Sequence, residues 1–322
     1  MTLRAFRVGV VGARRVRDGT GAFLARFLHA AGCKVVAVAG TSEATAAEAA
    51  RGLSAHDGIE AAPYGDARAM VERERLDALV VASPEGTHEP LLTLALDAGL
   101  HVLCEKPLLH APDDDAYPAR GAALVAAFAA RGLCLVVDAQ WRHALGAYMR
   151  LFPDVSPRAA RRFSMRLSPS VGGRAAVPVA MPHPLSVLDH LAPPERPGLT
   201  DLEVDVGDPG RLLVRFTHPG RGVRAEVELV VTTERPRPFS FGFDGAVATR
   251  VVREPGYRAA LVAEGLGREV ALPDPVEAVV KDFVARVRRG PPFPPEPPTV
   301  PGLVHLREVD RAVAAALAAA RR

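Results

Sequence analysis

Short apolar runs alternate with longer segments of helical period from residue 6 to about residue 140. The runs are rich in β-branched residues, and we expect strands at residues 6–11, 34–39, near 61, 78–82, 101–104 and 133–138. Between them, apolar residues recur every three or four positions, which predicts helices at residues 23–31, 43–53, 66–73, 88–98 and 119–131. This alternation is typical of parallel βαβ units, and right-handed crossovers then build an α/β fold with a doubly wound sheet.

The pattern changes after Trp141, where predicted strands follow one another without long helices between them. Alternating polar and apolar positions predict strands at residues 211–217, 223–232, 239–243 and 246–253. A proline-rich loop at residues 290–301 separates a helix at residues 275–289 from an alanine-rich helix at residues 303–320. We therefore expect a C-terminal α+β domain with a large mixed or antiparallel sheet.

The length of the chain agrees with this change of pattern. A chain of 322 residues exceeds what one hydrophobic core usually supports, so two domains are expected. We place the boundary between Asp138 and Pro157, and assign residues 1–142 to the first domain and residues 143–322 to the second. The sequence leaves open whether the last helix packs back on the first domain.

Composition narrows the classes of function. The 40 basic and 37 acidic side chains are interspersed and leave a net charge of only +3, which argues against nucleic acid as a partner. No apolar stretch approaches the roughly 20 residues of a membrane span, and the N-terminal apolar run is too short for a signal peptide. Three cysteines cannot all pair with one another, so we expect buried free thiols and a cytoplasmic protein.

A glycine turn follows the first predicted strand, where a dinucleotide pyrophosphate would rest on a helix N-terminus in a Rossmann domain. The turn begins at Gly12, but arginines stand where a regular fingerprint has its next two glycines. The candidate phosphate-binding residues are Gly12, Ala13, Arg14 and Arg15. Arginine side chains would there replace some of the backbone N–H groups. The same pattern also fits a solvated basic loop that binds nothing.

The end of the second predicted strand bears on the choice of cofactor. Thr41 and Ser42 follow this strand, at a position where an acidic residue would hold the ribose hydroxyls of NAD. Neither hydroxyl repels a 2′-phosphate, and both are able to bond one. The sequence therefore favours NADP over NAD slightly, although a hydroxyl here also fits the cap of the next helix.

Lys106 is the strongest candidate for chemistry. It leaves the fifth predicted strand between Glu105 and Pro107, at the carboxyl edge of the sheet where open α/β folds bind ligands. The chain has 37 arginines but only three lysines, Lys34, Lys106 and Lys281. A desolvated lysine is able to lose its proton, whereas arginine stays charged at ordinary pH. A structural Glu–Lys pair is the alternative.

Three segments resemble one known family. The segment at residues 99–107, with the sequence GLHVLCEKP, is similar to the corresponding part of the Gfo/Idh/MocA oxidoreductases, named for glucose-fructose oxidoreductase, inositol dehydrogenase and a rhizopine catabolism protein. The Ser83-Pro84 turn with His88, and the sequence DAQWR at residues 138–142, resemble the same family in order and spacing. In the C-terminal half the resemblance is architectural.

This resemblance implies hydride transfer between NAD(P) and a sugar, cyclitol or related hydroxy or carbonyl compound. It implies that Lys106 bonds the reacting oxygen and tunes its proton transfer. The residues that it implies on the nicotinamide side are Ser83, Pro84, His88 and Glu105, with Trp141 and Arg142 near the cofactor. For the last two residues, core packing and a surface salt bridge respectively are the alternatives.

The second domain departs from the family's pattern. Members usually carry an Asp-x-Gly-x-His-x-x-Asp helix that faces the nicotinamide. The matching stretch here, at residues 179–186, keeps the histidine as His183 but lacks both acids. We retain His183 as a catalytic candidate in support of Lys106, with a helix-start histidine of no chemical role as the alternative. Asp189 is a substitute acid if the helix, which Pro184 is expected to open, is shifted.

Two functions remain open on the sequence alone. One is an NAD(P)-dependent oxidoreductase acting on CH–OH groups of a small molecule, and the other is a non-catalytic dinucleotide-binding sensor or accessory subunit of the same fold. A short-chain dehydrogenase is excluded, because no tyrosine has a lysine four residues later. No metal site is expected, since no ligand pair has helical zinc spacing. We expect a homodimer or higher homo-oligomer that pairs through the C-terminal sheet.

Overall fold

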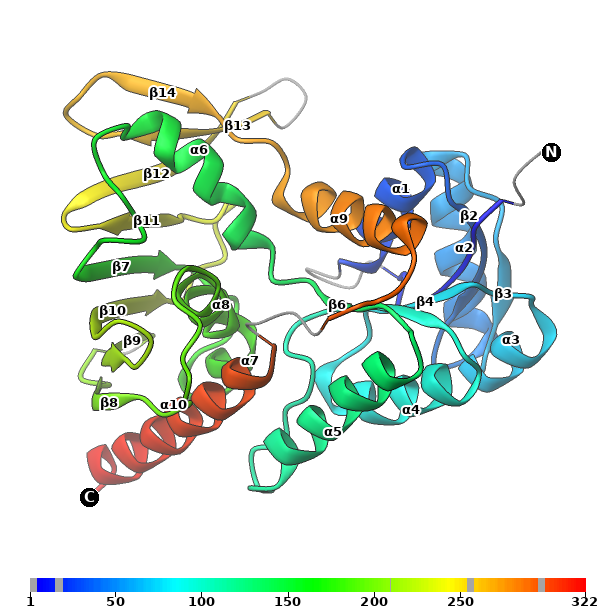
Figure 1. The fold of residues 1–322 in the computed structure, drawn as a ribbon, viewed down its shortest axis with the longest axis horizontal. Helices are drawn as coiled ribbons and strands as arrows, with labels where there is room; N and C mark the ends of the chain where they lie inside the picture. The colour runs from blue at the N-terminus through cyan, green and yellow to red at the C-terminus, as the bar shows by residue number, and fades with distance from the viewer. Residues whose placement is uncertain (1–4, 15–19, 209, 254–257, 295–298) are drawn as a thin grey trace. The chain divides into compact units, whose positions relative to one another are not determined.

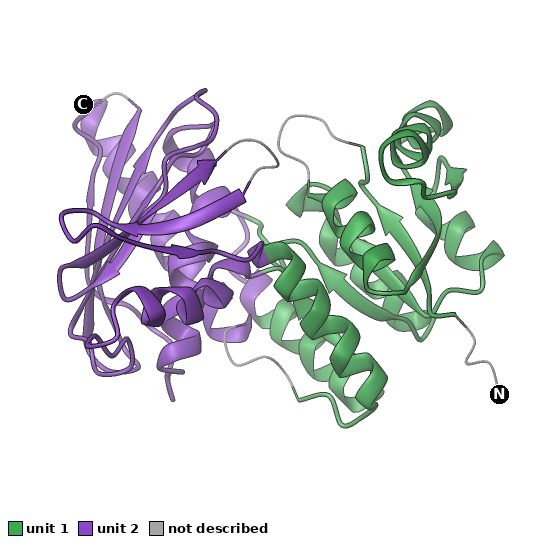
Figure 2. Cartoon of the chain, turned by 90° about the horizontal axis from the view of Figure 1, so that it is seen from above, with its two compact units in different colours: residues 1–111, 119–138, 276–296 green, residues 112–118, 139–275, 297–322 purple. Residues whose placement is uncertain are grey.

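The computed structural model describes residues 5–14, 20–208, 210–253, 258–294 and 299–322. The chain forms two compact units (Figure 2). The first comprises residues 1–111, 119–138 and 276–296, and the second comprises residues 112–118, 139–275 and 297–322. The chain therefore passes between the units several times rather than at one boundary after residue 142.

The first unit is built on a six-stranded parallel sheet with the order β3-β2-β1-β4-β5-β6 (Figure 1). Its strands are β1 (Arg7–Val11), β2 (Lys34–Ala39), β3 (Ala62–Tyr64), β4 (Ala78–Val81), β5 (His101–Cys104) and β6 (Leu135–Val137). The connecting helices are α1 (Gly21–Ala30), α2 (Glu43–Asp57), α3 (Ala67–Arg73), the 3-10 helix η1 (Glu85–Thr87), α4 (His88–Asp97) and α5 (Tyr117–Ala130). The order reverses between β1 and β4, the switch point of a doubly wound sheet. The predicted α/β class is confirmed.

Helices cover both faces of this sheet (Figure 1), which explains why its central strands are mostly apolar. Every residue of β4 is buried. The cysteines Cys33, Cys104 and Cys134 are buried and free, as the apolar runs predict. None of the described helices is long and apolar enough to span a bilayer.

The second unit contains an eight-stranded sheet with the order β14-β13-β12-β11-β7-β10-β9-β8. Its strands are β7 (Arg162–Leu167), β8 (Thr200–Asp205), β9 (Arg211–His218), β10 (Val223–Val230), β11 (Ser240–Phe243), β12 (Ala246–Arg253), β13 (Arg258–Ala263) and β14 (Arg268–Ala271). The sheet is mixed, because β7 runs parallel to β10 and antiparallel to β11. The predicted large mixed or antiparallel sheet is confirmed. The strands predicted above do not include β7, β8, β13 and β14, which are four to six residues long. Charged residues make up half of β8 and of β14.

Helices of the second unit lie along one face of this sheet (Figure 1). They are the 3-10 helices η2 (Gln140–Ala144) and η3 (Gly173–Ala175), and α6 (Leu145–Leu151), α7 (Ala176–Ala180), α8 (Pro182–Leu191) and α10 (Thr299–Ala320). Alternate residues of β10 are buried in the core beneath them. The intervening positions carry cross-strand ion pairs, Arg215 with Glu226 and Arg211 with Glu228, each at 2.7 Å. The open face of the sheet is thus charged.

Two C-terminal helices belong to different units. The helix α9 (Pro275–Arg289) completes the core of the first unit with Val279, Val280 and Phe283. The last helix, α10, contributes Leu306 and Val309 to the core of the second unit. The helix that returns to the first unit is therefore α9 and not the last helix, because its apolar stripe fits the core around β1 and β2.

Candidate active site

The turn after β1 packs directly against the turn after β4. Gly12 has a φ of +89°, and a Cβ at this position would lie 2.6 Å from the carbonyl oxygen of Ala82. At Gly21, the first residue of α1, a Cβ would lie 2.3 Å from the carbonyl oxygen of Gly12. Only glycine fits such close approaches of backbone to backbone. The close-packing glycine is therefore Gly21, and the motif is irregular because a longer loop separates it from Gly12.

The other three predicted phosphate-binding residues differ from one another in what the structure shows of them. Ala13 is buried. The Nε atom of Arg14 lies 2.8 Å from Oε2 of Glu48 on α2, so this guanidinium is engaged in an ion pair. Arg15 lies outside the described residues. Among the predicted loop residues that the structure describes, Gly12 alone has a geometric role that its residue type explains.

The hydroxyls after β2 divide their roles. Ser42 is the N-cap of α2, since its Oγ accepts a hydrogen bond from the backbone N–H of Thr45 and the Thr45 hydroxyl accepts one from the backbone N–H of Ser42. This capping box satisfies N–H groups at the start of the helix. Thr41 is exposed beside it. The helix cap is thus the role of Ser42, and Thr41 is the exposed residue that precedes the cap.

Glu105 joins the start of α1 to Lys106. Its Oε2 accepts a hydrogen bond from the Thr20 hydroxyl at 3.0 Å, and its Oε1 lies 3.7 Å from Nζ of Lys106. The Glu105 and Lys106 side chains are only 16% and 14% exposed. Because the Thr20 side chain bonds Glu105, it does not cap α1. The N-terminus of α1 and the lysine thus share one edge of the sheet, as a dinucleotide bound on a helix N-terminus requires.

Thr20 is a site residue that the sequence analysis missed. The available signal was its position immediately before the first residue of a strongly amphipathic helix, where a threonine commonly acts as an N-cap. That signal predicts a bond to the helix itself. The bond to Glu105, a residue far along the chain, could not be predicted from local spacing.

The turn after β4 separates two predicted residues from a third. Ser83 and Pro84 follow this strand at the same edge, and the Ser83 hydroxyl lies 2.6 Å from that of Thr87. His88 is fully buried instead. Its ring nitrogens contact backbone carbonyls on both sides. His88 therefore does not line a ligand site, contrary to the expectation. Its buried ring contacts the backbone of the turns at this sheet edge instead.

This geometry agrees with a match to a known family. The model of the Gfo/Idh/MocA oxidoreductases, a family described by an NAD-binding Rossmann fold, matches residues 6–138. The resemblance of residues 6–138 to this family is thereby confirmed. The match includes the six strands of the first unit, the glycine turn and Lys106.

Curated relatives match the same part of the chain. Inositol 2-dehydrogenase 1 of Saccharopolyspora erythraea is 40% identical over 110 residues, which are 34% of this chain and 29% of the relative. D-xylose 1-dehydrogenase (NADP(+)) 2 of Haloferax volcanii is 40% identical over 83 residues, which are 26% of this chain and 24% of the relative. The chain thus spans less than a third of the length of these relatives.

Solved structures of similar fold extend over nearly the whole chain. UDP-N-acetylglucosamine 3-dehydrogenase from Acidithiobacillus ferrooxidans has a TM-score of 0.69 at 21% identity, covering 98% of this chain and 100% of that one. A 3-ketoreductase from Actinomadura kijaniata, solved with TDP-benzene and NADP, has a TM-score of 0.64 at 22% identity, covering 97% of each chain. Both units therefore share the fold of these proteins.

Beyond the Gfo/Idh/MocA match, Trp141 and His183 contact each other in the second unit. Trp141 is 5% exposed and stacks on Phe239 with ring centroids 3.6 Å apart, and the Arg250 guanidinium lies 5.7 Å from its ring centroid. His183 meets the Trp141 ring edge-on, with centroids 6.4 Å apart. These contacts are the core packing given above as the alternative for Trp141. The helix α8 begins at Pro182 rather than at Pro184.

Arg142 is buried next to Trp141. Arg142 is only 7% exposed. Its Nε donates a hydrogen bond to Nε2 of His143 at 3.3 Å. A surface salt bridge therefore does not describe it. Lys106 belongs to the first unit, whereas Trp141, Arg142 and His183 belong to the second.

Asp189 is buried in the second unit between two histidines from other elements. Its Oδ1 accepts a hydrogen bond from Nε2 of His218 on β9 at 2.8 Å, and lies 3.3 Å from Nδ1 of His305 on α10. All three side chains are fully buried. The Asp189 carboxylate is therefore committed to the core and does not replace the acids missing around His183.

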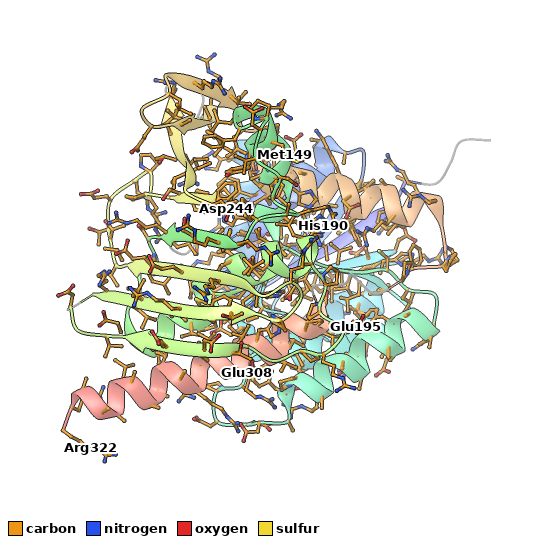
Figure 3. All side chains as sticks on the ribbon, turned by 60° about the vertical axis from the view of Figure 1, so that its left-hand side comes forward. Met149, His190, Glu195, Asp244, Glu308 and Arg322 are labelled. Atoms are coloured by element: carbon orange, nitrogen blue, oxygen red, sulfur yellow. The ribbon has the colours of Figure 1, made fainter. Side chains whose placement is uncertain are left out.

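The segment before β8 is held by α10. Glu308 (labelled in Figure 3) accepts a hydrogen bond from the backbone N–H of Leu199 at 2.8 Å. One turn earlier on the helix, Nε2 of His305 accepts one from the backbone N–H of Gly198 at 3.3 Å. This contact determines which ring nitrogen of His305 carries a proton.

The cluster of Asp189, His218 and His305 has the residue types of a metal site, with one ligand atom from each residue lying within 4.8 Å of the others. Its hydrogen bonds favour protons instead. Nδ1 of His218 accepts from the N–H of Gly220 at 3.3 Å, as Nε2 of His305 accepts from Gly198. Each neutral ring then carries its proton on the nitrogen that faces Asp189. Metal-ligating histidines have the opposite arrangement and donate from the outer nitrogen.

Proposed function

We propose that this protein is an NAD(P)-dependent oxidoreductase that transfers a hydride between the nicotinamide and a CH–OH or carbonyl carbon of a sugar, cyclitol or related compound. The observation that carries the proposal is the Glu105 bridge, which brings Lys106 to the same sheet edge as the N-terminus of α1. The relatives named above are dehydrogenases and a ketoreductase, which favours an enzyme over the sensor or accessory subunit.

The residues present fit a dinucleotide. Gly12 allows the turn after β1 to lie close against the turn after β4, Gly21 allows α1 to begin close against Gly12, and the start of α1 carries no side-chain cap. Backbone N–H groups at such a helix start favour phosphate. Thr41, exposed after β2, is the hydroxyl that we propose for a 2′-phosphate, so NADP is the favoured cofactor. When bound, the nicotinamide supplies or accepts the hydride.

Lys106 holds the proton that accompanies this hydride. In the oxidation of an alcohol, the C–H electron pair leaves with its hydrogen as hydride, and the neutral amine of Lys106 takes the hydroxyl proton. In the reduction of a carbonyl, the ammonium returns that proton to the oxygen. Glu105 keeps the Nζ atom at the edge through its 3.7 Å contact. We propose His183 as a second catalytic residue that assists this proton transfer.

The substitution Lys106→Arg tests this role with a matched control. Arginine keeps the charge but cannot readily give up a proton, so we expect turnover to fall by about 10² to 10⁴-fold with cofactor binding retained. The control is Lys281→Arg on α9, where an exposed lysine pairs with Glu277 at 2.8 Å. The assay follows nicotinamide absorbance with a panel of inositols, aldoses and nucleotide sugars. Full activity of Lys106→Arg would exclude the proposed role, and cofactor binding without turnover on any substrate would favour a sensor.

We also propose that two copies pair through the open face of the eight-stranded sheet. Its cross-strand ion pairs, such as Arg215 with Glu226, would give a polar interface that weakens at high salt. Light scattering at low and high ionic strength tests this. A mass of 34.1 kDa at every protein and salt concentration would exclude pairing.

A further inference from the structure

His88 stands at the junction of two strand-end turns in the first unit. It is the first residue of α4, and its side chain is fully buried. Nε2 lies 2.8 Å from the carbonyl oxygen of Ser83, in the turn after β4. Nδ1 lies 2.8 Å from the carbonyl oxygen of Pro107 and 3.3 Å from that of Leu108, in the turn after β5. The ring therefore connects the two turns that border Lys106.

In the described part of the chain, the polar groups around this ring favour a histidine that donates hydrogen bonds from both of its nitrogens. The three carbonyl oxygens only accept hydrogen bonds. The remaining neighbour is the Cys104 thiol, 3.6 Å from Nδ1, which donates to the carbonyl of Glu105 at 3.2 Å. A neutral imidazole donates from one nitrogen, so its other lone pair would face a carbonyl oxygen at 2.8 Å. Only the imidazolium donates from both.

The position of this cation is costly for the helix. A positive charge at the first residue of an α-helix opposes the helix dipole, which favours anions there. Burial adds a desolvation cost. A residue that breaks a local preference in this way is commonly held by a functional constraint. Here the constraint is the joint hold on Ser83 and on the residue directly after Lys106.

We propose that His88 is a protonated positioning residue, whose imidazolium ties the turn after β4 to the turn after β5 and thereby sets the place of Lys106. Burial alone lowers the pKa of this histidine. The interactions with the Cys104 sulfur, together with the carbonyls of Ser83 and Pro107, outweigh burial and raise the pKa to about 10. His88 touches neither substrate nor reacting atoms and acts through the backbone beside Lys106.

Ring ¹⁵N NMR of the full-length protein tests the protonation state directly. At pH 8 we expect both ring nitrogens of His88 to carry a proton, with imidazolium shifts that do not change between pH 6 and 8. His101 in the same unit is the internal control, because its Nδ1 accepts from the backbone N–H of Cys134 at 2.9 Å and burial lowers its pKa. His101 is therefore expected to show one protonated nitrogen. A single protonated nitrogen on His88 would overturn the proposal.

The effect on Lys106 is measured without any substrate. With only three lysines in the chain, ε-¹³C labelling gives three signals, and Lys106→Arg assigns the relevant one. In His88→Gln, one carbonyl loses its donor, so we expect the chemical shift of the Lys106 signal to move while the signals of Lys34 and Lys281 stay unchanged. His101→Gln should leave all three unchanged. An unaltered Lys106 signal in folded His88→Gln would refute the positioning role.

The consequence for turnover rests on the proposed function. A displaced Lys106 should lower kcat of His88→Gln on the order of 10²-fold, with a smaller change in KM, because catalytic geometry is lost while the binding surfaces remain. The two proposals fail separately. If Lys106→Arg is fully active while Lys106 still responds to His88→Gln, the catalytic role of Lys106 is wrong and the positioning role stands.

Discussion

The two units bury histidine in opposite hydrogen-bonding environments. In the first unit, both nitrogens of His88 face carbonyl acceptors. In the second, the outer nitrogens of His218 and His305 face backbone N–H donors, and their inner nitrogens face the Asp189 carboxylate. The first environment stabilises a cation, whereas the second stabilises two neutral rings beside one carboxylate.

The difference teaches that residue type does not assign a role to a buried histidine. By residue type and distance, Asp189, His218 and His305 resemble a set of metal ligands. By its place in the sequence, His88 resembles a residue that lines the cofactor site. In each case the partners of the second ring nitrogen decide. Donors on that nitrogen argue against a metal, and acceptors on both nitrogens argue for a positive charge.

Removal of Asp189 should have the largest effect in this comparison. In Asp189→Ala, Nε2 of His218 loses its hydrogen-bond acceptor, and Nδ1 of His305 loses the carboxylate that lies 3.3 Å from it, in a fully buried place. We expect a loss of about 2–4 kcal/mol in the free energy of unfolding. Urea denaturation measures it. The control Asp154→Ala, at an exposed position, should change stability by less than about 0.5 kcal/mol.

Added Zn²⁺ tests whether the cluster of Asp189, His218 and His305 holds protons or a metal ion. If the cluster holds protons, added Zn²⁺ should leave the Tm of the parent protein unchanged, and a chelator should not lower it. A Zn²⁺-dependent rise in Tm that disappears in Asp189→Ala would show that the cluster binds metal and that the tautomers inferred here are wrong.

The pH dependence of stability should differ between the two sites. The pKa of folded His88 is about 10, above its ordinary value of 6.5, because Cys104 and the carbonyls outweigh burial. The folded state then keeps a proton that the unfolded state releases, so this stabilisation is complete below pH 6.5 and is lost as the pH rises to about 10.

The expected slope in that window is at most about 1.4 kcal/mol per pH unit. Denaturation of the parent and of His88→Gln at pH 7, 8 and 9 measures it. The slope attributable to His88 should be absent in the variant. Parallel profiles for the two proteins would contradict a raised pKa.

Loss of His183 should be milder than loss of the Lys106 amine. Its usual acidic partners are absent, and the buried Asp189 does not replace them. We expect kcat of His183→Ala to fall by less than about 10²-fold. Steady-state kinetics on the substrate found in the panel checks this, with the exposed His190 on the same helix as control through His190→Ala. A larger loss than in Lys106→Arg would move the main proton-transfer role to His183.

Cofactor preference should be the smallest effect. Ser42 forms the N-cap of α2, and we propose the exposed Thr41 as the hydroxyl after β2 that bonds a 2′-phosphate. We expect NADPH to bind at least as tightly as NADH, and Thr41→Asp to weaken NADPH more than NADH through charge repulsion. Fluorescence titration of both reduced cofactors measures this. A clear NADH preference in the parent protein would show that the loop after β2 does not hold a 2′-phosphate.

The sequence by itself determined the first unit almost completely. Its central strands, such as β4, are buried on both faces, so they are continuous apolar runs bounded by helices of clear period. The position of Lys106 at a strand end follows from that order, because the carboxyl ends of parallel strands share one edge. The strands of the second unit were harder to predict from the sequence, since short strands such as β8 and β14 alternate charged and apolar residues over few positions.

Only the tertiary structure decided the state of the polar core. The bond between Thr20 and Glu105 joins residues 85 positions apart, and the partners of Asp189 come from a strand and a helix that lie far along the chain. His88 was visible in the sequence, but its charge depends on carbonyls of Ser83 and Pro107 that only the folded turns bring to it. Hydrophobic periodicity specifies which face of an element is buried, whereas hydrogen-bond partners depend on where distant backbone groups meet.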